Sequence, residues 1–209
     1  SQGILRMHYS NELTSRMAWE SLQIFKSFDE VVGGDSGYVK TGYLLIAGQG
    51  DRNAMAENVA MQKKIGISTE MISAGRVRDI APVFSVEDEE VCTYEPESGY
   101  ADPYLVTHAY GTAAKELGAE IHVSTPVERV EVSKGRVSGV VTPSGTISTR
   151  IALVAAGPWS SSFLESTGVV LPLGVIRHQV VIFRRPTHHN MAHPVLGDVV
   201  NGFSARPEV

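Results

Sequence analysis

The 209-residue sequence contains a single cysteine, Cys92, and no long apolar run. One thiol excludes an internal disulfide framework and is compatible with a reducing compartment, so we expect a cytoplasmic protein. No stretch approaches the roughly 18 consecutive apolar residues that cross a bilayer, and the first residues lack a basic segment followed by an apolar one. The sequence therefore predicts no membrane span and no targeting segment.

Charge of one sign is not concentrated anywhere in the chain. The 18 Lys and Arg residues are scattered among 23 Asp and Glu residues, for a net charge of -5. A nucleic-acid-binding surface needs a basic patch or stripe, so we predict no nucleic-acid partner. His188, His189 and His193 lie near Asp198, but their Pro- and Asn-rich setting is typical of a loop and lacks a second ligand cluster. We predict no metal site.

Hydrophobic residues make up 43% of the sequence, as in an ordinary globular protein with a packed core. Helices are predicted where a capping residue precedes apolar residues at three- and four-residue spacings. Asp102-Pro103 is the clearest start, because an N-cap is followed by proline at the first helical position. The predicted helices cover residues 12–28, residues 52–64 after Asp51, a short stretch between Ser73 and Pro82, and residues 104–117.

Strands are predicted where β-branched and aromatic residues lie between turn signals. Residues 38–47 predict a strand or a hairpin through Gly42, and residues 91–95 predict another strand. From Ala119 onward the pattern changes to short β runs, which predict a β-meander that feeds a fully apolar strand. These runs are residues 120–123, 127–132, 137–142, 146–149 and 151–155, and a further long strand is predicted at residues 172–183.

Four motifs occur together in an unusual order: Gly99-Tyr100-Ala101-Asp102-Pro103, Gly118-Ala119-Glu120-Ile121, Thr125-Pro126-Val127-Glu128-Arg129-Val130 and Ala155-Ala156-Gly157-Pro158-Trp159. On these motifs the sequence resembles the D-amino-acid-oxidase superfamily of flavoproteins. The matching branch holds sarcosine oxidase β-subunits, dimethylglycine dehydrogenases, glycine oxidases and dye-linked proline dehydrogenase β-subunits.

The resemblance implies an α+β fold with two kinds of domain. A mixed, largely antiparallel sheet flanked by helices would form the substrate domain, joined to a truncated FAD-binding domain with a β-meander. Residues 1–118 would belong mostly to the substrate domain and include a flavin-facing N-terminal strand. Residues 119–168 would be the remnant of the FAD-binding domain, and residues 169–209 would return to the substrate-domain sheet.

The resemblance also implies FAD as the cofactor. In relatives, the backbone at the positions of Gly3 and Ile4 approaches the isoalloxazine, and the residue that matches Val127 pairs its backbone with the adenine. The Ala-Gly-Pro-Trp element packs near the pyrophosphate and ribose, where a glycine after a buried strand permits close backbone contact. The candidate cofactor-binding residues are therefore Gly3, Ile4, Val127, Ala156, Gly157 and Trp159.

Arg6 is the candidate catalytic residue, because an arginine that matches it helps to hold the substrate carboxylate in relatives. A planar guanidinium can grip a carboxylate with two charge-assisted hydrogen bonds and stays ionised at any working pH. The alternative is a surface arginine near the start of a helix. His8 and Tyr9 could line the same pocket, although structural roles are the favoured interpretation.

The sequence departs from the family pattern in three respects. The Gly-x-Gly-x-x-Gly motif and the C-terminal Gly-rich segment are absent, so we expect an internal fragment that does not retain FAD and is inactive alone. No histidine near Asp102-Pro103 matches the one that attaches FMN in heterotetrameric sarcosine oxidases, which favours the proline-dehydrogenase or glycine-oxidase side. Apolar surface left by a missing domain core predicts self-association.

The predicted function is FAD-dependent oxidation of an amino acid to an imine. The substrate would be a secondary amine such as sarcosine or proline, or else glycine or a D-amino acid, and partner subunits are compatible with the resemblance. Flavin would accept the hydride while the protein binds, orients and excludes water. Two alternatives stay open: a non-catalytic subunit or binding module with the same fold, and a glycerol-3-phosphate-dehydrogenase-like flavoenzyme.

Overall fold

The computed structural model describes residues 2–165, 167–186 and 192–208. The chain divides into two compact units, of which unit 1 comprises Ser1–Ala119 and Arg185–Val209 and unit 2 comprises Glu120–Arg184. Unit 1 is therefore built from two stretches that are far apart in the sequence. The expected division after residues 118 and 168 assigns segments to a substrate domain and a cofactor domain, and that assignment stays a prediction.

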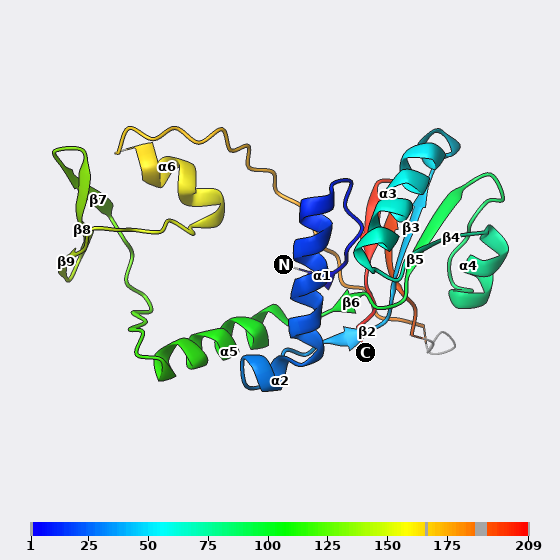
Figure 1. The fold of residues 1–209 in the computed structure, drawn as a ribbon, viewed down its shortest axis with the longest axis horizontal. Coiled ribbons are helices and arrows are strands. Elements are labelled where there is room, and N and C mark those ends of the chain that lie inside the picture. Colours follow the sequence, from blue (N-terminus) through cyan, green and yellow to red (C-terminus); the bar gives the residue numbers. More distant parts are fainter. Residues whose placement is uncertain (1, 166, 187–191, 209) are drawn as a thin grey trace. The chain divides into compact units, whose positions relative to one another are not determined.

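A five-stranded sheet forms the centre of unit 1 (Figure 1). Its strand order is β11-β10-β3-β5-β4, in which β10 and β3 run parallel and the other neighbours run antiparallel. The predicted mixed, largely antiparallel α+β fold is confirmed. The strands are β3 (Tyr43–Ala47), β4 (Glu70–Ile72), β5 (Val91–Glu95), β10 (Val195–Asp198) and β11 (Phe203–Ala205).

The helices of unit 1 begin and end close to the predicted residues because their caps are local. The Asn11 side chain accepts a hydrogen bond from Thr14 N–H at the start of α1. Gly66 ends α3 with a φ of 100°, the left-handed conformation that favours glycine. The helices are α1 (Glu12–Lys26), α2 (Phe28–Val31), α3 (Arg52–Ile65), α4 (Ala74–Ile80) and α5 (Pro103–Glu116), with a 3-10 turn η1 (Gln49–Asp51) before α3.

The two faces of the five-stranded sheet are covered by different helices (Figure 1). Successive side chains of a strand point to opposite faces. Leu44 and Ile46 of β3 pack with Val77 of α4. Ala47, which points the other way, packs with Met55 of α3. The α3 face is the one that matters below, because the odd-numbered residues of β3 and β5 lie on it.

A second sheet of unit 1 has the strand order β1-β6-β2 and is antiparallel. The hairpin alternative for residues 38–47 is wrong, because β2 pairs with β6 while β3 pairs with β5 and β10. Gly42, with a φ of 81°, lies between β2 and β3, where the chain passes from one sheet to the other. The strands are β1 (Ile4–Leu5), β2 (Val39–Lys40) and β6 (Gly99–Tyr100).

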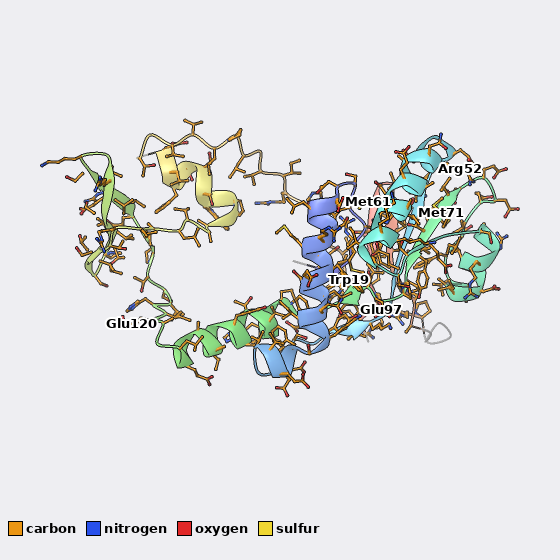
Figure 2. The ribbon with its side chains drawn as sticks, viewed as in Figure 1. Trp19, Arg52, Met61, Met71, Glu97 and Glu120 are labelled. Atoms are coloured by element: carbon orange, nitrogen blue, oxygen red, sulfur yellow. The ribbon has the colours of Figure 1, made fainter. Side chains whose placement is uncertain are left out.

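The predicted meander is confirmed in unit 2 as a separate antiparallel sheet. Its strands are β7 (Arg129–Ser133), β8 (Arg136–Thr142) and β9 (Gly145–Ser148), and the chain continues through η2 (Gly157–Trp159) and α6 (Ser160–Glu165). Side chains crowd around the sheet and α1 of unit 1, where Trp19 and Glu97 are labelled, whereas those beyond Glu120 stand farther apart (Figure 2).

The strands predicted at residues 120–123, 151–155 and 172–183 are wrong, since these described residues form neither helix nor strand. A fully apolar strand is stable only between neighbouring strands with both faces covered. Leu153 is instead 91% exposed, so the described part of unit 2 does not supply that environment. None of the described helices combines the length and apolar character needed to cross a membrane.

Candidate functional site

The segment Arg6 to Tyr9 lies between β1 and α1 without regular secondary structure, although Met7 is only 1% exposed. Buried backbone groups need hydrogen-bond partners, and here side chains provide them. Met7 N–H donates to Glu95 Oε2 at 3.0 Å. Gln62 Nε2 donates to the carbonyl oxygens of Met7 and Tyr9, at 3.4 Å each. The segment is thus fixed by a residue of β5 and a residue of α3.

Arg6 extends its guanidinium over two tyrosine rings. The guanidinium carbon lies 4.9 Å from the ring centroid of Tyr9 and 5.6 Å from that of Tyr43, within cation–π range. Arg6 Nη1 also donates to the carbonyl oxygen of His8 at 3.0 Å. No ion pair joins Arg6 to a carboxylate of the described residues. Its charge is therefore oriented by neutral groups and available to an anion.

Tyr43 lies on the α3 face of the sheet, directly across from Glu95 in the β3–β5 pair. Burial raises the pKa of the Tyr43 hydroxyl, and the nearby Arg6 charge offsets only part of that rise. The phenol is therefore protonated at neutral pH. Gly197 of β10 leaves room for it, because a Cβ added there would lie 2.3 Å from the Tyr43 oxygen.

Glu95 is fully buried, and its two carboxylate oxygens have different surroundings. Oε2 accepts from Met7 N–H and from Ser98 Oγ–H, the latter at 2.8 Å. Oε1 has no hydrogen-bond partner and lies 3.6 Å from His8 Nδ1, which also has none. His8 is 7% exposed. A buried carboxylate and a buried imidazole therefore face each other beside Arg6.

Gly3 and Ile4 immediately precede this cluster. Gly3 has a φ of 62°, and a Cβ added there would lie 2.2 Å from the carbonyl oxygen of Ala101. Ile4 pairs with Tyr100 in the β1–β6 ladder and packs against a core cluster that contains Tyr43. The structure thus brings Gly3, Ile4 and Arg6 together within unit 1.

The other four predicted cofactor contacts belong to unit 2. Val127, just before β7, is 41% exposed, and Trp159 at the end of η2 is 72% exposed. Ala156 and Gly157 are also exposed. Gly157 has a φ of 54°, and a Cβ added to it would meet no atom within 4 Å. Exposed glycine backbone of this kind permits the close approach of a ligand.

The described residues contain no group of three or more His, Cys, Asp or Glu side chains that could hold a metal ion. His188 and His189 lie outside the described residues. The His193 ring lies edge-on to Phe84, and Asp198 accepts hydrogen bonds from Asn201.

The family resemblance pointed to Arg6, whose role stays a prediction, and sequence analysis did not single out its neighbours Tyr43, Gln62, Glu95 and Gly197. Gln62 and Glu95 contact Met7 across 55 and 88 residues, and no local spacing signals such pairs. Two weaker signals were present. A glutamate ends the strand Val91–Glu95, whose other residues are uncharged, and a glycine interrupts the strand Val195–Asp198.

A protein-family model and several known proteins match most of this chain. A family model described as FAD dependent oxidoreductase matches residues 1–208. The chain is 29% identical over 159 residues to the mitochondrial pyruvate dehydrogenase phosphatase regulatory subunit of Mus musculus, and 27% identical over 168 residues to the mitochondrial sarcosine dehydrogenase of Homo sapiens. The matches cover 76% and 78% of the chain but 18% of either relative, so the chain spans less than a fifth of their length.

A similar fold occurs among solved structures. L-proline dehydrogenase from P. horikoshii superposes with a TM-score of 0.76 at 23% identity, and the match covers 93% of this chain and 52% of that chain. At this identity the likeness concerns the fold alone.

Proposed function

The chain belongs to the family of FAD-dependent oxidoreductases, and on this premise we propose that the intact protein oxidises a small amino acid to an imine. The substrate class is a secondary amine such as sarcosine or proline, or else glycine or a D-amino acid. Bound FAD would accept the hydride from the carbon next to the nitrogen. The sarcosine dehydrogenase relative supports this class, because its name gives a secondary amine as the substrate.

The surroundings of the Arg6 guanidinium carry the proposal. A partly buried guanidinium that is held over Tyr9 and Tyr43, without a carboxylate partner among the described residues, is suited to an external carboxylate. Arg6 would hold the substrate carboxylate through paired hydrogen bonds. Tyr43, protonated at neutral pH, would add no negative charge of its own beside the guanidinium.

Six residues are proposed to contact the cofactor. The backbone at Gly3 and Ile4 would face the flavin ring, immediately before Arg6 in the chain. The exposed backbone around Gly157 would lie against the pyrophosphate and ribose, and Val127 would meet the adenine. The full set is Gly3, Ile4, Val127, Ala156, Gly157 and Trp159.

The visible absorption spectrum of the protein expressed from its complete gene tests the proposal. Anaerobic addition of sarcosine, proline, glycine or a panel of D-amino acids is expected to bleach a flavin band. Arg6→Met, which removes the charge but keeps the length, should raise KM for the effective substrate about a hundredfold, and Arg6→Lys less. A coloured protein that none of these compounds bleaches would contradict the proposed substrate class.

A non-catalytic subunit with the same fold is the second candidate, favoured by the similarity to a protein named as a regulatory subunit. A colourless full-length protein would favour this candidate. Bleaching by glycerol 3-phosphate instead of an amino acid would favour a glycerol-3-phosphate-dehydrogenase-like flavoenzyme. We expect the 209 residues alone to be inactive, and amine-dependent dye reduction by them would contradict this.

A further inference from the structure

The segment that carries Arg6 is held by two buried polar side chains and not by a helix or a strand. Glu95 and Gln62 are both 0% exposed, and they approach the segment from β5 and α3. Burying a carboxylate and a carboxamide is unfavourable unless hydrogen bonds compensate it. Here the compensating hydrogen bonds are made with the buried backbone of the segment itself.

The hydrogen bonds of the two side chains end on the backbone around Arg6. Glu95 accepts from Met7 N–H at 3.0 Å, one residue after Arg6. Gln62 donates to the carbonyl oxygens of Met7 and Tyr9. Arg6 itself donates to the carbonyl oxygen of His8, which lies between those two residues. The backbone that orients the guanidinium is thus the backbone that Glu95 and Gln62 fix.

We infer that Glu95 and Gln62 are positioning residues that hold the Arg6 guanidinium where it binds the substrate carboxylate, an inference that rests on the proposed function. Both side chains would act through the backbone of the segment and not on the substrate itself. Glu95 acts through Met7 and faces His8 Nδ1 with its second oxygen, 3.6 Å away. Gln62 acts from the helix that covers the same face of the sheet.

Three variants separate positioning from simple stability. Glu95→Met and Gln62→Met keep the length of the side chain but remove the groups that bond to the segment, whereas Glu95→Gln keeps an acceptor for Met7 N–H. Thr93→Val is the matched control, because Thr93 lies on the same strand, is 1% exposed and has a hydroxyl without a partner. Thermal unfolding of each variant reports any general loss of stability.

Kinetics of the full-length protein should show the positioning role directly. With the amino acid that bleaches the wild-type flavin, Glu95→Met and Gln62→Met are expected to raise KM about tenfold with a smaller change in kcat. Glu95→Gln, which keeps the acceptor, should have a KM within about twofold of the wild-type value, and Thr93→Val should leave KM unchanged. A lower melting temperature with unchanged KM in both Met variants would overturn the inference.

Binding of benzoate, a carboxylate without an oxidisable amine, provides a readout that does not depend on turnover. Glu95→Met should weaken its calorimetric Kd about tenfold, and Arg6→Met should weaken it at least as much. If an amino acid bleaches the wild-type flavin but KM is unchanged in both Met variants, the positioning role alone is refuted and the proposed function stands. If no amino acid bleaches the flavin but Glu95→Met weakens benzoate binding, the proposed function falls and the positioning role stands. Unchanged benzoate binding in both Met variants overturns the positioning role.

Discussion

At the scale of the single residue, Gly3 shows how tightly the chain is fixed just before Arg6. Its φ of 62° disfavours any side chain, and a Cβ would lie 2.2 Å from the carbonyl oxygen of Ala101. Gly3→Ala should therefore lower the free energy of unfolding by about 3 kcal/mol in urea titrations. Gly118→Ala is the control, because Gly118 has a φ of 92° but open space around it, and about 1 kcal/mol is expected. Equal effects would contradict the steric argument.

Cys92 is predicted to be unreactive in the folded protein. It is 0% exposed, and burial, reinforced by Glu90, raises the pKa of its thiol from 9.0 to about 11. A chromogenic disulfide reagent at pH 8 should modify it only after unfolding in urea, because the thiolate is the reacting form. Stoichiometric reaction within seconds without urea would contradict this.

The folded-state pKa of the Cys92 thiol lies above its unfolded-state pKa. The contribution of this thiol to stability is therefore complete below pH 9 and is lost as the pH rises towards 11.

At the scale of the element, the start of α5 offers a matched test of capping. The Asp102 carboxylate accepts from the N–H groups of Tyr104 and Leu105, at 2.7 and 3.2 Å. Asp102→Ala should destabilise by about 1 kcal/mol and speed amide exchange in α5, while Asp102→Asn should be nearly neutral. Asp51 occupies the same position at α3 without a capping hydrogen bond. Asp51→Ala should have little effect, and a loss as large as that of Asp102→Ala would contradict the assignment.

The elements differ in how far their own sequence predicts them. Helices α1, α3, α4 and α5 were predicted because caps and apolar spacing lie within the element. The run 151–155 was predicted as a strand from its apolar composition, yet a strand also needs partners, and Leu153 is left 91% exposed. For the same reason the sequence could not show that β2 and β3 pair with different strands, β2 with β6 and β3 with β5. The Arg6 site follows this rule too: Arg6 lies next to its backbone partner in sequence, whereas Glu95 and Gln62 reach it only through the fold.

At the scale of the whole molecule, the apolar surface of unit 2 predicts self-association. Ile151, Ile182 and Phe183 are all more than 80% exposed: 84%, 88% and 84% respectively. Exposed apolar surface in a soluble protein marks sites of association or aggregation. The 209-residue chain should therefore sediment as species whose average mass rises with concentration in the micromolar range. Ile182→Glu combined with Phe183→Glu should reduce that rise, and a concentration-independent monomer mass for the unaltered chain would refute the prediction.

Unit 1 is completed by a distant part of the chain, because β10 lies inside the five-stranded sheet, between β3 and β11. Its residues are all buried and pair in parallel with β3. Trypsin should cut the exposed, irregular stretch at Arg177 and Arg184, but the C-terminal piece should stay bound through β10.

Size-exclusion chromatography should show the N-terminal and C-terminal pieces, residues 1–177 and 185–209, eluting together and separating only in urea. Leu196→Asp, which places a charge at a position that is 2% exposed, should release the piece after cleavage. Separation of the unaltered pieces without urea would contradict this prediction, because the pairing of β10 with β3 would then be too weak to hold the C-terminal piece. Co-elution would mean that the C-terminal piece is held by strand pairing between residues about 150 positions apart, and pairing over that distance leaves no local signal from which the sequence could predict β10.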